Sequence, residues 1–499
     1  MRKREVFLIV ILTLINLILL FGLKWIKNNI GLISIDEIIF HLRVPLSGTS
    51  RSLVSDIIKT CVIPIILIII FLIILLMIIN KYNKIFEIKK FKRDININLI
   101  KTVVKLLLIA NIILLVIQII NYNNKFNVTE YIKLQRSNSK FIEENYVNPK
   151  DVSIKFPKNK RNLIYIYLES MEATYMDDKN GGLQSKNIIP ELTNLALKNT
   201  NFSNTDKLGG PYQLFGTSWT IAAMVAHTAG IPLKIPLGNN SYSGYGEFLP
   251  GVYNLGDILY ENGYNNTIMV GSDIRFGGRS EYFKTHGKYN LKDYYTAITD
   301  GIIEQGHYEF WGMEDSYLFE YAKKELLRIS NEEQPFNFTL LTVNTHYPEG
   351  YLEGVCNNEF EDNKYASVIA CSSKQVSEFV EWIMEQDFYK NTTIVISGDH
   401  LTMADNVILQ GDYERTVYNT IINSSIKTKN NLNRKFSTFD WFPTTLASLG
   451  VKIENNKLGL GVNLYSDEKT LIEKYGFDYV NSELSKKSIF YNNKFLYNK

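Results

Sequence analysis

Three long apolar segments lie close together in the first quarter of the chain. They cover residues 6–23, 61–79 and 102–120. A helix needs about 20 consecutive apolar residues to cross the hydrocarbon core of a bilayer. We therefore predict three membrane-spanning helices. The first follows a basic cluster, as a signal peptide would, but it has no small-residue cleavage site, so we interpret it as a retained anchor.

Basic residues in the short connecting segments predict the orientation of these helices. The N-terminus carries Arg2, Lys3 and Arg4. The segment between the second and third spans carries Lys81, Lys84, Lys89, Lys90, Lys92 and Arg93. Cytoplasmic loops are enriched in Lys and Arg, so we place both clusters in the cytoplasm. Everything after Ile120 is then expected outside the cell, away from cytoplasmic nucleotides.

The segment between the first two spans has the pattern of a short amphipathic helix. Ser34 and Glu37 have the spacing of a capping box, and the helix would extend to Arg43. Its apolar stripe consists of Ile35, Ile38, Ile39 and Leu42. We expect this stripe to rest on the outer leaflet and His41 to be an interfacial side chain rather than a ligand.

Beyond the third span the chain changes from polar segments to alternating strands and helices. Strand patterns occupy residues 162–168, 267–271, 336–343 and 391–397, and helical patterns occupy 189–199, 217–230, 315–329 and 372–385. This alternation predicts an α/β domain with a mostly parallel sheet flanked by helices. We expect a membrane region at 1–121, a helical stalk at 122–157, an extracytoplasmic catalytic domain at 158–470 and a C-terminal extension at 471–499.

Three of these strands end on side chains that bind metals. Glu169 follows the first strand, His346 follows the third, and Asp399 with His400 follows the fourth. In a parallel α/β sheet the ligand site lies beyond the carboxyl ends of the strands. A single Asp-His pair would be an ordinary surface turn, but three converging strand ends predict a metal or phosphate site.

Five stretches of the chain carry a resemblance to a known family. They are residues 162–172 (NLIYIYLESME), 215–224 (FGTSWTIAAM), 342–348 (TVNTHYP), 397–400 (SGDH) and 440–446 (DWFPTTL). The chain resembles the phosphoglycerol transferase and lipoteichoic acid synthase family of the alkaline phosphatase and sulfatase superfamily, nearest to the phosphoglycerol transferase I type. The likeness covers about residues 158–466 and, more loosely, 36–49. It implies a sulfatase-like fold.

The resemblance also implies a set of site residues. One divalent metal, usually Mn²⁺, would be held by Glu169, Thr217, Asp399 and His400. Two carboxylates and an imidazole also suit Zn²⁺, and Mg²⁺ remains possible. His346 matches the substrate-side histidine of the family. Arg279 matches an arginine that binds the phosphate or glycerol part, with Arg275 as a competitor.

Thr217 is the predicted nucleophile, with Ser218 as its rival. Thr217 follows Gly216 at the expected start of a helix, where an alkoxide and a phosphate are both favoured. A simple N-cap is the alternative role for this threonine. The Cys/Ser-x-Pro-x-Arg pattern of sulfatases is absent here, which excludes the formylglycine mechanism. His346 would exchange a proton with the leaving or accepting alcohol, or else be a strand-end histidine satisfied by backbone.

The implied reaction moves glycerol phosphate from phosphatidylglycerol to a glycan or polyglycerolphosphate acceptor through a phosphothreonine intermediate and releases diacylglycerol. A phosphoethanolamine transferase and an inactive glycolipid-binding receptor are the alternatives. Three spans, rather than the five of lipoteichoic acid synthases, leave the acceptor open. A net charge of +3 and no basic patch with interleaved aromatics argue against nucleic acid. No nucleotide-binding loop occurs in the sequence.

The chain contains three cysteines with different expected roles. Cys61 lies in an apolar run and is most simply a small buried side chain. Cys356 and Cys371 flank a short polar segment of the domain expected outside the cell, where disulfides persist. We expect these two to pair, with two free thiols as the alternative.

Overall fold

The computed structural model describes residues 3–31, 33–45, 47–88, 93–235, 247–404, 413–428 and 430–497, and the side chains of 82–102 are not described. Four basic residues of the orientation argument, Arg2, Lys89, Lys90 and Lys92, lie outside the described residues. The chain divides into two compact units. One unit comprises Met1–Gly31 and Arg51–Tyr131, and the other comprises Leu32–Ser50 and Ile132–Lys499.

The first unit contains the apolar helices. Its elements are α1 (Lys3–Asn29), α3 (Arg51–Ile57), the π-helix η1 (Ile58–Val62), α4 (Ile63–Ile88) and α5 (Arg93–Phe126). Within the described residues, Arg4–Asn29, Arg51–Lys81 and Val103–Phe126 are long and apolar enough to cross a membrane. This confirms the three predicted apolar helices. Asn16 donates to Asn111 at 3.0 Å, a polar contact that joins α1 and α5 where water is scarce.

The second unit is built around a six-stranded sheet. Its strands, in spatial order, are β4 (Asn290–Lys292), β3 (Asn265–Val270), β5 (Phe336–Leu341), β2 (Asn162–Leu168), β6 (Thr392–Gly398) and β7 (Asn419–Ile422). Every neighbouring pair is parallel except β6 with β7. The predicted α/β fold with a mostly parallel sheet is thus confirmed. β2 is central, with β5 on one side and β6 on the other.

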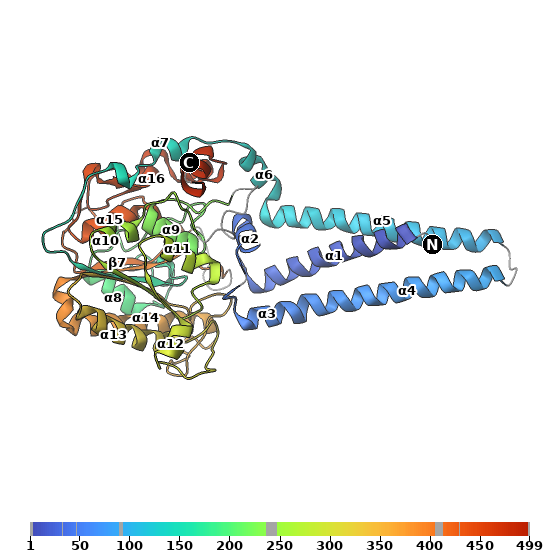
Figure 1. Ribbon diagram of the computed structural model, residues 1–499, viewed down its shortest axis with the longest axis horizontal. Coiled ribbons are helices and arrows are strands. Elements are labelled where there is room, and N and C mark those ends of the chain that lie inside the picture. The colour runs from blue at the N-terminus through green and yellow to red at the C-terminus, as the bar shows by residue number, and fades with distance from the viewer. Residues whose placement is uncertain are drawn as a thin grey trace. The chain divides into compact units, whose positions relative to one another are not determined.

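Alternation along β2 explains how the sheet is covered. Leu163, Tyr165 and Tyr167 enter one hydrophobic core, whereas Ile164 and Ile166 enter the other, as the two-residue period of a strand requires. The first core is completed by α9 (Thr220–Ala229), α10 (Leu255–Glu261), α11 (Arg279–Thr285) and α15 (Trp441–Ser448). The second is completed by α8 (Pro190–Lys198), α13 (Asp315–Ser330) and α14 (Lys364–Glu385). The two helix sets cover opposite faces of the sheet (Figure 1).

One short helix from between the first two spans belongs to the second unit. This helix is α2 (Ile35–His41), and Ser34 caps it by accepting the backbone N–H of Glu37. Phe40 and Val44 are part of the first hydrophobic core. The short helix is therefore confirmed, whereas contact of its isoleucine stripe with the outer leaflet stays a prediction. Periodicity selected the isoleucine stripe, but the large Phe40 ring decides which face is buried, and Leu42 at the end of that stripe is 80% exposed.

The segments on either side of the sulfatase-like motifs also pack within the second unit. They form α7 (Phe141–Asn145), α16 (Leu471–Tyr475), α17 (Phe477–Ser485), α18 (Ile489–Tyr491) and the end of α6 (Val128–Arg136), whose residues up to Tyr131 belong to the first unit. Phe141 contacts Tyr479 with ring centroids 6.0 Å apart, and Ser139 donates to Glu483 at 2.6 Å. Most of the expected stalk, from Ile132 onward, and the C-terminal extension therefore share one core with the sheet.

The remaining elements are short. They are β1 (Ile154–Lys155), paired with β8 (Lys452–Ile453), β9 (Lys457–Leu458), paired with β10 (Gly461–Val462), α12 (Tyr294–Thr299), and the π-helix η8 (Asn492–Leu496). The 3-10 helices are η2 (Pro149–Asp151), η3 (Ala173–Tyr175), η4 (Phe276–Gly278), η5 (Asp387–Asn391), η6 (Thr438–Asp440) and η7 (Glu454–Asn456). Cys356 and Cys371 form a disulfide with Cα atoms 5.8 Å apart.

Candidate functional site

Two of the three predicted strand ends bring a compact group of ligand atoms together. Glu169 follows β2, and Asp399 and His400 follow the neighbouring strand β6. One ligand atom from each of the three side chains lies within 4.8 Å of the others. His400 Nε2 is 3.5 Å from Glu169 Oε1 and 3.4 Å from Asp399 Oδ2. All three residues are buried.

Backbone geometry fixes this group. Asp399 Oδ1 accepts the backbone N–H of Ser170 at 2.8 Å and that of His400 at 2.7 Å. Ser170 has a φ of 54°, a strained value for a serine, and its hydroxyl donates to Glu169 Oε1 at 2.8 Å. His400 Nδ1 lies 2.9 Å from the carbonyl oxygen of Leu401. A proton on Nδ1 leaves Nε2 as the free ligand atom, as in metal-binding histidines.

The charges in the group suit a cation. Burial raises the pKa of Asp399, and the neighbouring Glu169 raises it further. Burial alone would lower the pKa of His400, but Asp399 and Glu169 more than offset this and raise it. Among the described residues, the buried Asp399 Oδ2 has no hydrogen-bond partner. A divalent metal would satisfy this oxygen, and two carboxylates with an imidazole form a suitable donor set.

Thr217 lies in the turn that precedes α9, not on the helix itself. Its hydroxyl donates to the carbonyl oxygen of Leu214 at 2.8 Å and accepts the Leu214 N–H at 3.1 Å. Gly216 makes the turn with a φ of 75°, and a Cβ there would lie 2.9 Å from the Leu233 carbonyl oxygen. The expected helix start at Thr217 is therefore wrong by three residues, and the alternative N-cap role is excluded, because Trp219 holds the N-cap position and α9 begins at Thr220.

The start of α9 nevertheless meets the acidic group. Thr220 Oγ1 donates to Glu169 Oε2 at 3.4 Å. Thr217 is completely buried, three residues before this contact. The chain from Thr217 to Thr220 therefore reaches the carboxyl end of β2. Thr220 was not a candidate from sequence, since a threonine in the first turn of a helix usually has only a local role.

The charges of His346 and Arg279 both act on Glu169. His346 contacts Trp311 with ring centroids 4.6 Å apart and the rings tilted by 51°, and its Nδ1 lies 2.9 Å from the Tyr347 carbonyl oxygen. Burial would raise the pKa of Glu169, but the charges of His346, His400 and Arg279 and a hydrogen bond from Ser170 lower it. Both side chains are thus close enough to Glu169 to stabilise its charge.

The two candidate arginines have different environments. Arg279 is 5% exposed and donates to Ser272 Oγ and to the Asp273 carbonyl oxygen, both at 3.0 Å. The side chain of Arg275 is 54% exposed and pairs with the Asp273 carboxylate at 2.6 Å. Arg279 therefore remains the better candidate for contact with a bound phosphate.

Sequence reasoning did not identify Glu37 and His41 of α2. Burial raises the pKa of Glu37, whereas His400 lowers it and Glu169 raises it. His41 stacks on Phe276 with ring centroids 5.6 Å apart, and Phe276 contacts Trp311 at 5.0 Å. The sequence did contain a signal that could have identified them. A carboxylate and an imidazole lie on the side of α2 away from the isoleucine stripe.

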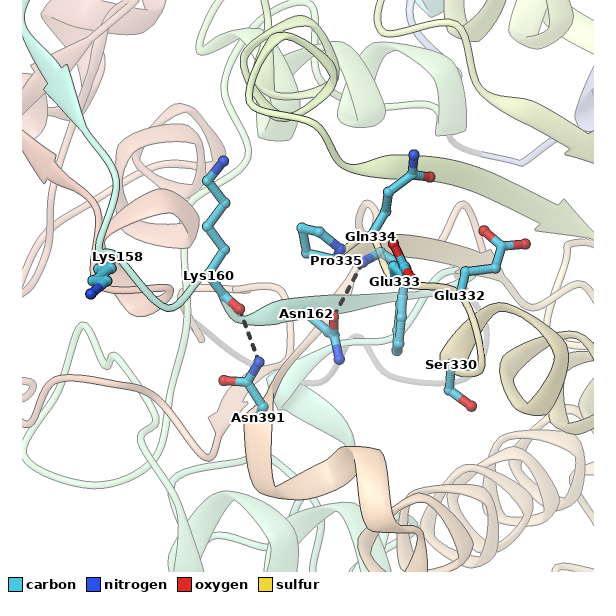
Figure 2. A pocket seen from close by; sticks show the side chains of 10 residues that line it. Lys158, Lys160, Asn162, Ser330, Glu332, Glu333, Gln334, Pro335 and Asn391 are labelled. Atoms are coloured by element: carbon cyan, nitrogen blue, oxygen red, sulfur yellow. Dashed lines mark hydrogen bonds between the residues drawn. The ribbon is translucent and has the colours of Figure 1, made fainter.

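A polar cavity at the opposite end of the sheet is separate from this group. It has a volume of about 370 Å³ and its lining residues include Lys158, Lys160, Asn162, Glu332 and Asn391. Figure 2 shows it around the amino end of β2, where the Asn391 side chain bonds the Lys160 carbonyl oxygen. Glu169 follows the carboxyl end of the same strand. The cavity is therefore no part of the candidate site.

Comparison with known proteins agrees with this architecture. Residues 161–451 match the sulfatase family. Phosphoglycerol transferase I of Escherichia coli (strain 55989 / EAEC) is 33% identical over 342 residues, which cover 67% of this chain and 42% of that protein. Phosphoglycerol transferase I of Salmonella choleraesuis (strain SC-B67) is 34% identical over 321 residues, 62% of this chain and 40% of that protein. The chain thus spans about two fifths of the length of these curated relatives.

One solved structure resembles the chain over most of its length. It is the integral membrane lipooligosaccharide phosphoethanolamine transferase A from Neisseria meningitidis. The aligned region covers 91% of this chain and 85% of that protein. The TM-score is 0.50 and the sequences are 14% identical, so this likeness concerns the fold alone. The sequence match over residues 161–451 decides the family: the chain belongs to the sulfatase family.

Proposed function

We propose that this protein is a membrane-bound phosphoglycerol transferase. It takes glycerol phosphate from phosphatidylglycerol, holds it on Thr217, passes it to a glycan or polyglycerolphosphate acceptor and releases diacylglycerol. The observation that carries this proposal is the meeting of the Glu169, Asp399 and His400 side chains with the start of α9, three residues after Thr217. The names of the two curated relatives support the same chemistry.

The metal site of the proposal consists of Glu169, Asp399 and His400, with the Thr217 hydroxyl as a fourth ligand. We expect Mn²⁺, because hard carboxylate oxygens combined with an imidazole favour it over Mg²⁺. When bound, such an ion neutralises phosphoryl oxygens and lowers the pKa of a hydroxyl. Thr217 supplies the nucleophile from a turn that fixes its hydroxyl against Leu214.

The first half of the reaction forms a bond between Thr217 Oγ1 and phosphorus and breaks the bond from phosphorus to the diacylglycerol oxygen. Thr217 loses its proton to water and diacylglycerol gains one, so the step is balanced. We assign His346 as the donor of that proton through Nε2, because its Nδ1 is directed at the Tyr347 carbonyl oxygen. Burial lowers the pKa of His346, so a proton taken up at Nε2 is readily given up again.

The second half reverses these roles. An acceptor hydroxyl loses its proton to His346 and attacks phosphorus, and the bond to Thr217 Oγ1 breaks as that oxygen regains a proton from water. Arg279 would hold the phosphate or the glycerol through both halves. Its guanidinium is buried and already oriented by Ser272 and the Asp273 carbonyl, so little side-chain entropy is lost when a substrate binds.

The proposed location is the bacterial cell membrane with the catalytic unit outside the cell. The basic clusters described above support this orientation. The apolar helices of the first unit would keep the enzyme among its lipid donors and so raise their effective concentration.

Diacylglycerol release tests the proposed reaction. The full chain is reconstituted in vesicles that contain either phosphatidylglycerol or phosphatidylethanolamine, with Mn²⁺ present. We expect diacylglycerol from the phosphatidylglycerol vesicles only, and none from an Asp399→Asn variant. Release from phosphatidylethanolamine alone would favour a phosphoethanolamine transferase. No release from either lipid would contradict transfer and favour an inactive lipid-binding receptor.

A further inference from the structure

The segment between the first two apolar helices is built into the catalytic unit at several points. Phe40 packs on Trp219 with ring centroids 5.6 Å apart, and Val44 is buried in the same core. At the end of the segment, the Ser50 hydroxyl donates to the Phe310 carbonyl oxygen at 3.0 Å. Residues about 260 positions apart are thus joined, and the segment is a fixed part of this unit.

Gly48 brings the segment against the turn that carries Arg279. A Cβ at Gly48 would lie 2.7 Å from the backbone nitrogen of Phe276, and the φ of Gly48 is 83°. Phe276 is the first residue of η4, and Arg279 follows that short helix directly. The Arg279 guanidinium also lies 5.7 Å from the centre of the Phe276 ring. The segment therefore supports the part of the site assigned to phosphate binding.

One face of α2 carries polar groups into the same region. Glu37, Phe40 and His41 are three and four residues apart, so they share a face of the helix. Glu37 is 3% exposed, and it lies one helical turn before Phe40 and His41, which contact Trp219 and Phe276. A buried carboxyl in this place is costly unless it has a binding partner or a functional role.

His41 is the first ring of a short aromatic series that ends beside the proposed acid. Its imidazole stacks on Phe276, which contacts Trp311, which in turn contacts His346. The charges of His41 and His346 also interact. Ring faces of this kind pack against the C–H groups of a polyol, while the imidazole nitrogens can bond its hydroxyls.

An unsatisfied donor lies beside Phe40. Trp219 is 3% exposed, and its indole N–H has no hydrogen-bond partner among the described residues. A buried N–H without a partner destabilises the folded state. Because Trp219 is two residues from Thr217, an oxygen of a substrate held at Thr217 is a suitable acceptor for it.

We propose that Glu37 and His41 bind the hydroxyl groups of the phospholipid head group, so that the loop between the first two membrane helices forms part of the substrate site. A glycerol head group carries two hydroxyls, which can pair with a carboxyl and an imidazole at once. This inference rests on the proposed transfer reaction, and it adds the residues that recognise what is transferred.

Recognition of the head group can be tested separately from the chemical step with two soluble phosphodiesters. Both have p-nitrophenol as the leaving group. One carries glycerol on the phosphate, and the other carries an ethyl group without hydroxyls. The full chain, wild type and variants, is assayed in detergent with Mn²⁺. We expect His41→Ala and Glu37→Met each to raise the KM for the glycerol diester by about tenfold, as the loss of one hydrogen bond to a ligand predicts. The KM for the ethyl diester should not change.

Leu42→Ala is the matched control, because Leu42 is next to His41 but 80% exposed. It should leave both diesters unaffected. Equal losses on both diesters in His41→Ala would show a purely structural role and overturn the inference. If His41→Ala does not fold, His41→Asn carries the same test at nearly the same size, and an unchanged KM for glycerol there would also overturn it.

The same assay distinguishes failure of the inference from failure of the proposed function. If the wild type hydrolyses neither diester, the transfer reaction itself is contradicted. If it accepts both with equal KM, the reaction stands and hydroxyl recognition is wrong. A third diester that carries an aminoethyl group completes the set. A preference for it that disappears in Glu37→Met would replace hydroxyl recognition with recognition of an ammonium group.

Discussion

Asp399 and Ser170 are joined by a hydrogen bond that links two neighbouring strands at the centre of the site. The Ser170 N–H donates to Asp399 Oδ1 at 2.8 Å, while the second carboxylate oxygen, Oδ2, is buried and has no hydrogen-bond partner among the described residues. One oxygen thus positions the side chain and the other remains available. Such a division is typical of a carboxylate that binds a metal and is itself held by a backbone donor.

Replacement of Asp399 by alanine should remove the bound metal. Loss of a residue that only hydrogen-bonds a metal ligand already lowers metal affinity about 10–100-fold. Loss of the ligand itself should lower the affinity at least as much. Metal content of the purified full chain, measured by mass spectrometry, checks this. Asp300→Asn is the control, because Asp300 is partly exposed and pairs with Lys292. Stoichiometric metal in Asp399→Ala would show that the ligands lie elsewhere.

Chelation should abolish activity, and Mn²⁺ should restore it better than Mg²⁺. The imidazole of His400 is the reason, since nitrogen ligands favour Mn²⁺ and Zn²⁺ over Mg²⁺. Activity of the chelated full chain is measured on a soluble phosphodiester as each ion is added back. Full recovery with Mg²⁺ alone would contradict a role for His400 as a ligand.

Alanine at Gly48 should destabilise the catalytic unit. The positive φ costs about 1–2 kcal/mol for a residue with a Cβ, and the contact with the Phe276 backbone adds to this. A lower unfolding temperature and weaker binding of the glycerol diester are both expected. Gly354→Ala is the matched control, because a Cβ at Gly354 would meet nothing within 4 Å. Equal unfolding temperatures for the two variants would contradict the close packing of this segment.

The central strands and the acidic group could be predicted from sequence because their signals are local. Asn162–Leu168 is a continuous apolar run that ends on Glu169, and the structure assigns a strand with the same bounds. Asp399 and His400 follow the next strand of the sheet. Ligand sites lie at the carboxyl ends of parallel strands, so the sequence predicts that these two strand ends form one site.

The role of α2 could not be predicted in this way, because it depends on contacts distant in sequence. The isoleucine stripe predicted the helix correctly, but a stripe suits a lipid surface and a protein surface equally. It could not show that Phe40 contacts Trp219 and that His41 contacts Phe276. The position of Thr217 could not be predicted for a similar reason. Gly216 forms a turn before the helix, so α9 begins three residues later than the sequence pattern predicts.

The disulfide between Cys356 and Cys371 should be present in protein isolated from the membrane. It closes a loop of 15 residues, for which chain entropy gives about 3 kcal/mol of stabilisation. Peptide mapping without reduction should recover the two cysteines as one linked pair, and Cys371→Ser should lower the unfolding temperature. Cys61→Ser is the control in the other unit. Two thiols that alkylate without reduction would show that the bond does not form.

The orientation predicted from the basic clusters can be tested with a reporter that is active only in the cytoplasm. Fused after Lys160, beyond the third apolar helix, the reporter should be silent, whereas fused after Lys81 it should be active. The second fusion is the internal control for expression. An active reporter after Lys160 would place the catalytic unit in the cytoplasm and exclude an external glycan acceptor.

Thr217 should carry the head group between the two halves of the reaction. Its hydroxyl is fixed by two hydrogen bonds to Leu214, so Thr217→Ser should retain part of the activity, whereas Thr217→Ala should lower diacylglycerol release by several orders of magnitude. The backbone hydrogen bond from the N–H of residue 217 to the Leu214 carbonyl oxygen, 3.2 Å long, does not depend on the side chain, and Glu169, Asp399 and His400 remain, so Thr217→Ala should still bind metal.

The mass of the intact protein after brief exposure to phosphatidylglycerol, without acceptor, shows the intermediate directly. A glycerophosphate adduct is expected on the wild type and should map to Thr217. Ser218→Ala is the matched control, because Ser218 is the adjacent hydroxyl, and it should still form the adduct. An adduct that persists in Thr217→Ala, or that maps to Ser218, would assign the nucleophile to another residue. Since metal binding is measured in the same variants, a lost adduct with retained metal separates loss of the nucleophile from collapse of the site.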